Sequence, residues 1–398
     1  MSKEVLAPSV LSAGNHQSNN ETTVSSHASV NRRSFLKKSM ITGAVATGAG
    51  LLAGGIPAFA QETNPASITQ GDIDILRFLA AAELLETDLW TQYTELGGVQ
   101  DSEESGQNGG SPLYTAALQI LDQDMPQYIH DNTDDEKSHQ AFINAYLQSI
   151  GADPVDLTQF ATLPGSKATG ARNVGRLTNL MNLTVDTGFW TRYRSATQNP
   201  DLDTNVKFPL SEVIVNRTAI PRTDADLVGP AHIAPFNIPD HLKAIAFTAG
   251  FHFAFIEQGG SSLYPSLAQR VTNVDVLRIL LSIGPTETSH FQTWHDKAGN
   301  VLTVFDTDPV TGAKVGFRQL TTNQPESLQA NLIMPEPCPF MSTKFPACSI
   351  IRPTNTTGVA MGAVKALTAD GLFIGQSQDF FNTLNALATA ADAAVRGF

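Results

Sequence analysis

Four stretches of this 398-residue chain carry a glutamate within an apolar stripe, and this feature constrains the fold more than any other. The apolar residues recur at steps of three and four, which keeps their side chains on one face of an α-helix. The four glutamates are Glu86, Glu136, Glu257 and Glu287. Because a helix packs its apolar face into the core, each helix directs a carboxylate inward. An isolated carboxylate there costs several kcal/mol, so four together require compensating positive charge.

Two of these glutamates have a histidine three residues later, and the other two have a tyrosine seven residues later. In chain order the motifs are Glu86-x6-Tyr93, Glu136-x-x-His139, Glu257-x6-Tyr264 and Glu287-x-x-His290. A spacing of three places carboxylate and imidazole side by side, so both can bind one ion. Chance spacing of the Glu, His and Tyr residues gives fewer than one match to either motif. The alternating set therefore predicts a metal site between four helices.

The donor types restrict the metal. Carboxylates and imidazoles suit iron or manganese, with iron the preferred assignment, and they exclude a thiolate zinc centre. Two divalent ions would balance four carboxylates, so the folded state should depend on metal. Glu83 lies one turn before Glu86 and is the alternative ligand on that helix, although it lies off the main stripe and no tyrosine follows it at the seventh position.

The motif set resembles the di-metal carboxylate site of the ferritin-like superfamily, in which two helices each give a Glu and two each give Glu-x-x-His. The Glu-x6-Tyr pairs are similar to the rubrerythrin and bacterioferritin branch. The export-type N-terminus, the acidic composition and the segment around Trp190 are similar to exported members of the desiccation- and stress-related group. The resemblance implies a mainly α fold, namely a ferritin-like four-helix bundle.

The resemblance also implies roles for individual residues. Glu86 and Glu257 would each bind one of two metal ions, Glu136 and Glu287 would bridge them, and His139 and His290 would bind one each. Tyr93 and Tyr264 would support the ligands. The implied chemistry is reaction with O₂ or H₂O₂, as a peroxidase, catalase or ferroxidase with Fe(II) as a possible substrate, in oxidative or desiccation stress. The alternative is a non-catalytic protective protein whose metals hold the fold together.

Three features depart from a bare bundle. The predicted bundle covers 61–299, with helices near 72–95, 113–150, 239–258 and 274–298. Gly259 and Gly260 should end the third helix, and Pro285 should bend the fourth or start a new one. A long insert, 151–238, separates the second and third helices, which argues against a compact storage cage.

The insert is expected to contain a helix over 174–194. There, Arg192 and Arg194 beside Trp190 form either a structural clamp or an anion site. The remainder, 300–398, is predicted as a mixed, loop-rich extension with a hairpin over 301–319 and a terminal amphipathic helix. We expect this extension to serve packing or assembly into a homo-oligomer.

The first 60 residues have the pattern of an export signal. Arg32 and Arg33 precede an uncharged, glycine-rich run that ends in a small-x-small pattern at Ala60, followed by Gln61. This resembles a twin-arginine (Tat) signal preceded by a disordered leader, which implies cleavage between Ala60 and Gln61, the Tat translocase as a partner, and a periplasmic or secreted protein. A retained membrane anchor is the alternative.

The cysteine count and the net charge complete the prediction. Cys338 and Cys348 are the only cysteines, and an oxidising compartment allows a disulfide between them; two free buried thiols are the alternative. The formal charge is −13, from 25 Lys and Arg against 38 Asp and Glu. Such a chain lacks the cationic surface that duplex binding needs, so nucleic acid is excluded as a partner.

Overall fold

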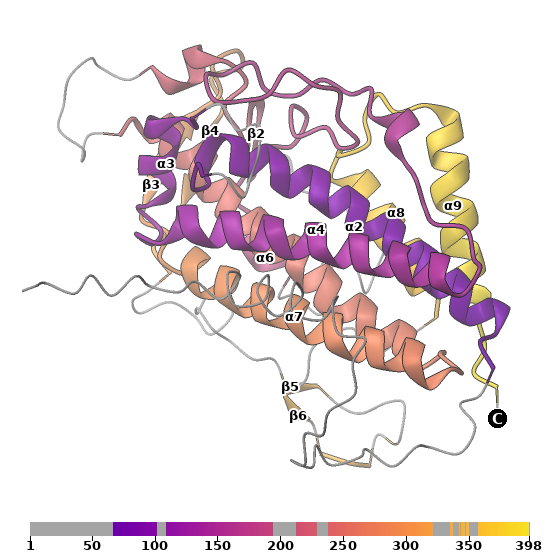
Figure 1. The fold of residues 1–398 in the computed structure, drawn as a ribbon. Coiled ribbons are helices and arrows are strands. Elements are labelled where there is room, and N and C mark those ends of the chain that lie inside the picture. Colours follow the sequence, from indigo (N-terminus) through magenta and orange to yellow (C-terminus); the bar gives the residue numbers. More distant parts are fainter. Residues whose placement is uncertain are drawn as a thin grey trace, which may run out of the picture. The chain divides into compact units, whose positions relative to one another are not determined.

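A computed structural model describes residues 67–101, 109–193, 212–228, 238–320, 335–336, 342, 344–346, 348–349 and 357–397. All of them lie in one compact unit, Thr63–Phe398. The described residues form eight α-helices and a few short strands, so the fold is mainly α, as predicted (Figure 1).

Four long helices form the centre of this unit: α2 (Gln70–Gly97), α4 (Met125–Ser149), α6 (Asp240–Ala268) and α7 (Val274–Ala298). The most extensive helix contacts are between α6 and α7 and between α2 and α4 (Figure 1). The two pairs meet through aromatic rings. Trp90 of α2, Phe253 of α6 and Trp294 of α7 lie with ring centroids 4.7 to 5.2 Å apart.

The starts of these helices are defined by capping side chains. Thr69 and Asp72 form a capping box at the start of α2, with each side chain bonded to the other residue's backbone N–H. Asn273 accepts hydrogen bonds from the first N–H groups of α7. Asp72 also accepts from the backbone of Thr272 and Asn273, so one carboxylate ties the start of α2 to the start of α7.

The prediction of one helix over 113–150 is wrong, because the chain forms α3 (Pro112–Leu118) and then turns before α4. Asp122 accepts a hydrogen bond from the N–H of Asp124 inside this turn. Pro126 follows in the first turn of α4, where its missing N–H costs nothing. The turn residues and Pro126 thus restart the helix.

The third helix does not end near 258, as predicted, but continues to Ala268. Helix α6 is buried along nearly its whole length, and such packing outweighs the weak helix propensity of Gly259 and Gly260. Pro285 lies inside α7, which runs unbroken past it. Leu281 and Pro285 are exposed, so the carbonyl that loses its helical partner is on the solvent side.

The described part of the insert is mostly irregular. Strands β1 (Thr184–Asp186) and β2 (Val213–Thr218) pair antiparallel, with a register shift after Thr184. The expected helix over 174–194 is wrong for the described residues up to 193, where only the four-residue α5 (Phe189–Arg192) is helical. Two 3₁₀ turns, Thr158–Phe160 and Asp224–Leu227, complete this part.

The C-terminal region combines strands and helices. Strands β3 (Val304–Thr307) and β4 (Lys314–Phe317) form the expected hairpin, and β5 (Pro335–Glu336) pairs with β6 (Cys348–Ser349). The expected terminal helix is α9 (Gln378–Ala393), which packs on α2. A further helix, α8 (Val359–Ala369), was not predicted; it lies against α6 and α9.

Within the part of the chain that the structure describes, no helix is both long and apolar enough to cross a bilayer. Arg32, Arg33, Ala60, Gln61 and Cys338 lie outside the described residues. The predicted export signal and disulfide therefore remain predictions.

Candidate metal centre

Each of the four long helices contributes a carboxylate to one buried cluster. Its members are Glu83 of α2, Glu136 and His139 of α4, Glu257 of α6, and Glu287 and His290 of α7. On α4 and on α7 the spacing of three residues places Glu and His on the same helix face, as the sequence pattern predicted.

The donor atoms form two overlapping groups. One consists of Glu83, Glu136, His139 and Glu287, the other of Glu136, Glu257, Glu287 and His290, and within each group the donor atoms lie within 4.8 Å of one another. Glu136 and Glu287 belong to both. Each group therefore has a histidine and one glutamate of its own and shares the remaining two carboxylates.

The two histidines use the same ring nitrogen. His139 Nδ1 lies 3.2 Å from Glu136 Oε2, 3.2 Å from Glu287 Oε1 and 3.3 Å from Glu83 Oε2. His290 Nδ1 lies 3.2 Å from Glu136 Oε1 and 3.2 Å from Glu257 Oε2. Glu136 thus presents one oxygen to each histidine, while the two imidazole centroids are 6.3 Å apart.

This arrangement fits a cation better than a proton. A ring nitrogen carries at most one proton, yet His139 Nδ1 faces three carboxylate oxygens. Among the described residues, no hydrogen bond reaches either oxygen of Glu287 or the Oε2 atoms of Glu83 and Glu257. Buried polar atoms are normally satisfied, and a metal ion at the centre of each group would satisfy all of these oxygens at once.

Burial and charge shift the pKa values in the cluster in opposite directions. Glu136, Glu257 and Glu287 are fully buried and Glu83 is 1% exposed. Burial, with the charge of Glu136, raises the pKa of Glu83 to about 7 and that of Glu287 well above its usual range. At Glu136 the two imidazoles outweigh burial and lower the pKa. Four carboxylates are therefore not all ionised here unless positive charge joins them.

Polar neighbours fix the orientation of the donors. The side-chain amide of Asn132 donates to Glu136 Oε1 (2.8 Å) and Glu257 Oε1 (3.0 Å), and Trp294 Nε1 donates to Asn132 Oδ1 (2.7 Å). His290 Nε2 lies 3.1 Å from Asp135 Oδ2. A carboxylate there favours a proton on Nε2, which leaves the Nδ1 lone pair facing the cluster.

On α2 the structure places Glu83, not the predicted Glu86, among the donors. The hydroxyl of Tyr264 donates to Glu83, so this predicted tyrosine does lie beside the cluster. The hydroxyl of Tyr93 instead lies 3.1 Å from His252 Nδ1. The other predicted donors, Glu136, His139, Glu257, Glu287 and His290, are brought together.

A signal for Glu83 was present in the sequence. Leu79, Glu83 and Trp90 define a second stripe on α2, and Trp90 contacts Phe253 and Trp294 in the aromatic layer next to the cluster. The Glu-x6-Tyr motif predicted Glu86 because Tyr93 follows it at the seventh position, whereas the residue at that distance from Glu83 is Trp90.

The arginine of the insert is held as a clamp. Arg192 lies 2.5 Å from Asp186 and 3.4 Å from Glu212, and its guanidinium covers the ring of Phe189. Its charge is thus compensated by two carboxylates, which leaves it poorly suited to bind an anion. Arg194 lies outside the described residues.

Comparisons with family models, with curated proteins and with solved structures found no match to this chain.

Proposed function

We propose that this chain is a ferritin-like four-helix bundle that binds two metal ions and reacts with O₂ or H₂O₂. In this proposal α2, α4, α6 and α7 are the bundle and residues 151–238 are its insert. Glu83 and His139 would hold one ion and Glu257 and His290 the other, and Glu136 and Glu287 would contribute donors to both. The observation that carries the proposal is the pair of donor groups that share these two carboxylates.

The donor set favours iron, with manganese next. Carboxylate oxygens and imidazole nitrogens suit both ions, and the cluster contains no thiolate. Two divalent ions would bring four positive charges to four carboxylates, which removes the repulsion that raises the pKa of Glu83 and Glu287. Two adjacent redox-active ions supply two-electron exchange with O₂ or H₂O₂.

The chain's own residues would prepare the site for this chemistry. Tyr264 holds a proton next to Glu83, and its hydrogen bond orients that carboxylate. Asn132 fixes Glu136 and Glu257 relative to each other, and Trp294 fixes Asn132. The layer of Trp90, Phe253 and Trp294 is almost completely buried and excludes water from one side of the donors.

The setting that we propose rests on the sequence. The paired arginines and the small-x-small pattern at Ala60 support export by the twin-arginine route and a periplasmic or secreted protein. A homo-oligomer and a role in oxidative or desiccation stress belong to the same proposal.

One observation favours a second function. The four carboxylates are at most 1% exposed. Such burial is typical of a structural metal site, which is closed to substrate, rather than of a catalytic one. The alternative is therefore a protective protein whose metals are structural.

Elemental analysis of the full chain purified after native export tests the proposed site. We expect about two iron or manganese ions per chain, and almost none in Glu136→Ala/Glu287→Ala. Unchanged metal content in that double variant would show that the site is assigned wrongly.

Turnover of H₂O₂ and oxidation of Fe(II) by the loaded protein separate the two functions. Either activity, lost in the double variant, supports the enzyme. A fully loaded protein that consumes no peroxide and oxidises no Fe(II) leaves only the structural role.

A further inference from the structure

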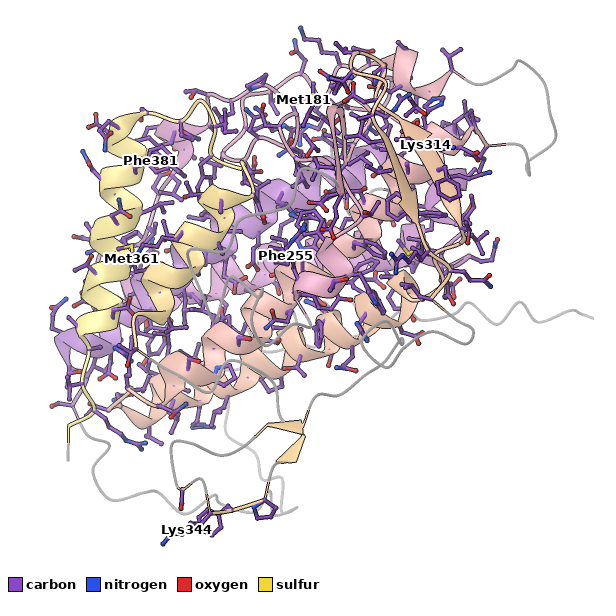
Figure 2. All side chains as sticks on the ribbon, turned by 180° about the vertical axis from the view of Figure 1, so that it is seen from behind. Met181, Phe255, Lys314, Lys344, Met361 and Phe381 are labelled. Atoms are coloured by element: carbon purple, nitrogen blue, oxygen red, sulfur yellow. The ribbon has the colours of Figure 1, made fainter. Side chains whose placement is uncertain are left out.

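A small apolar cavity lies beside the metal cluster, between α2, α6, α8 and α9. Figure 2 shows this side of the molecule and labels Phe255 of α6, which lines the cavity, and Met361 of α8. The cavity volume is about 50 Å³, whereas a cavity that holds a benzene ring has roughly 150 Å³. The space therefore fits a molecule of two non-hydrogen atoms or a single large atom, but not a ring or a longer chain.

Two adjacent glycines of α6 line the cavity where it borders the metal cluster. A Cβ atom at Gly259 would meet nothing within 4 Å, so no described neighbour requires a glycine there, although glycine is a poor helix former. What its missing side chain provides is open volume. A Cβ atom at Gly260 would lie 2.6 Å from Glu287 Oε2. Gly260 therefore brings the cavity wall against a carboxylate that both donor groups share.

The wall of the cavity offers almost nothing to a polar molecule. The side chains that line it are apolar except that of Glu86. Burial, together with the charges of Glu287 and Glu136, raises the pKa of Glu86 well above its usual range, so its carboxyl group is protonated and uncharged at neutral pH. A buried water molecule typically makes about three hydrogen bonds, and this wall provides one uncharged polar side chain. The cavity has room for water but lacks the partners that would hold it.

A different edge of the cluster suits polar molecules. His139 of α4 and His290 of α7 are 8% and 9% exposed. Asp135, whose Oδ2 lies 3.1 Å from His290 Nε2, has a side chain that is 47% exposed. Neither α4 nor α7 lines the cavity. Water, H₂O₂ and metal ions find hydrogen-bonding and charged groups along this edge, so the apolar cavity is not needed for their approach.

We propose that this cavity binds O₂ beside the metal pair and excludes H₂O₂. Each of the two molecules has two non-hydrogen atoms, so the volume does not distinguish them. H₂O₂ would give up its hydrogen bonds to water without regaining them in the cavity, whereas O₂ is apolar and has none of similar strength to lose. The inference rests on the proposed function where it identifies O₂ as the oxidant that reaches the metals from this side. As a binding site for an apolar gas, the cavity does not depend on that function.

Xenon binding tests the cavity without any reaction, because xenon is apolar like O₂ and occupies dry apolar cavities. We expect the NMR signal of dissolved xenon to shift in proportion to the concentration of the metal-loaded full chain. Gly259→Leu and Ala363→Leu fill the cavity from α6 and from α8, and each should reduce this shift at least threefold. Ala386→Leu adds the same side chain at an exposed position of α9 and should keep the wild-type shift. An equal shift in all four proteins would overturn the site.

Rates of Fe(II) oxidation test the choice of oxidant. Full chains loaded with Fe(II) in the absence of air are mixed with O₂ or with H₂O₂, and the absorbance of Fe(III) is followed by stopped flow. Two Fe(II) and two protons reduce one O₂ to H₂O₂, or one H₂O₂ to two water molecules. In both filling variants we expect the rate with O₂ to fall about tenfold and the rate with H₂O₂ to stay within about twofold of the wild type. Equal slowing with both oxidants, as a distorted metal site would give, or an unchanged rate with O₂ would overturn the proposal.

The two measurements separate this inference from the proposed function. Xenon binding by a protein that oxidises no Fe(II) with either oxidant would remove the proposed function and leave the gas site. Oxidation with both oxidants by a protein that binds no xenon would leave the function and remove the site. Metal content and melting temperature show whether each variant is loaded and folded, and the second filling variant keeps the test valid if the first misfolds.

Discussion

Glu83 and Glu86 lie one turn apart on α2 in different surroundings. Glu83 Oε2 is 3.3 Å from His139 Nδ1, and its other oxygen accepts from Tyr264. Glu86 lines the apolar cavity. Removing one donor from a metal site weakens metal binding. Glu86 lies near the cluster, where burial and the charges of Glu287 and Glu136 raise its pKa well above the usual range, but it belongs to neither donor group.

We therefore predict that Glu83→Gln loses at least half of its bound metal, whereas Glu86→Gln keeps wild-type content. Elemental analysis of both variants, purified in parallel, checks this. The reverse result would make Glu86 the ligand. It would mean that α2 is displaced along and around its axis by about one helical turn from the arrangement described here.

His252 provides a pH-dependent prediction away from the metals. It is fully buried, its Nδ1 lies 3.1 Å from the hydroxyl of Tyr93, and burial lowers its pKa to about 3. The unfolded chain therefore takes up a proton near pH 6.5 that the folded chain refuses. The contribution of neutral His252 to the free energy of unfolding is complete above about pH 6.5 and is lost as the pH falls towards 3.

Between pH 7 and pH 5, this group should remove about 2 kcal/mol from the free energy of unfolding. His252→Gln keeps an acceptor for Tyr93 but does not titrate. Urea titrations give the free energy of unfolding at both pH values. Its decrease from pH 7 to pH 5 should be smaller in the variant than in the wild type by that amount. Because both proteins are compared over the same pH range, any effect of acid on the metals cancels. Equal losses would mean that His252 takes up its proton in the folded state.

At this scale, the sequence predicted most of the cluster. The spacing of three fixed Glu136 with His139 and Glu287 with His290, because neighbouring positions on a helix face leave little freedom. The choice between Glu83 and Glu86 depends on the rotation of α2 about its axis. Contacts with other helices set that rotation, and local spacing does not report it.

At the scale of one helix, Gly259 and Gly260 of α6 differ in the space around them: a side chain fits at Gly259 but not at Gly260. We predict that Gly260→Ala displaces Glu287, because its Cβ would lie 2.6 Å from Glu287 Oε2, and that it loses metal and about 1–3 kcal/mol of stability. Gly259→Ala meets nothing within 4 Å and should keep its metal and gain about 0.5–1 kcal/mol. Metal content and thermal unfolding of the two neighbours check both outcomes, and equal behaviour would contradict the described close approach.

Helix ends were predicted less well than helix faces. The chain turns at 119–124, where Pro126 restarts α4, and α6 runs past two glycines to Ala268. Turn residues and prolines act locally, but whether they break a helix depends on the packing around it. Gly259 and Gly260 lie in a helix surrounded by other elements, and that burial is not visible in the chain's own spacing.

At the scale of the whole molecule, metal should contribute strongly to stability. Without ions, the fold must bury carboxylates that repel one another or hold extra protons. We predict that a chelator lowers the melting temperature of the wild type by about 10 °C or more, and that Glu136→Gln/Glu287→Gln shows no response. One kcal/mol corresponds to about 2–4 °C in a chain of this size. Identical melting curves with and without chelator in the wild type would argue against metal in the fold.

The sequence predicted the mainly α fold but not how its later parts are used. The hairpin β3–β4 and helix α9 were expected from alternation and helical spacing. That α9 packs on α2, and that α8 closes a cavity against α6, depends on contacts between residues far apart in the chain. Periodicity predicts which face a helix buries, but it does not identify the helix on the other side.

The distribution of donors over the helices has one further consequence. The first group takes its donors from α2, α4 and α7, and the second from α4, α6 and α7. Neither the N-terminal helix pair nor the C-terminal pair holds a full set for either ion. Metal binding would then depend on correct packing of the two helix pairs. A chain whose pairs pack in the correct register would bind its ions, whereas a misfolded chain would bind none and would be degraded by proteases more readily.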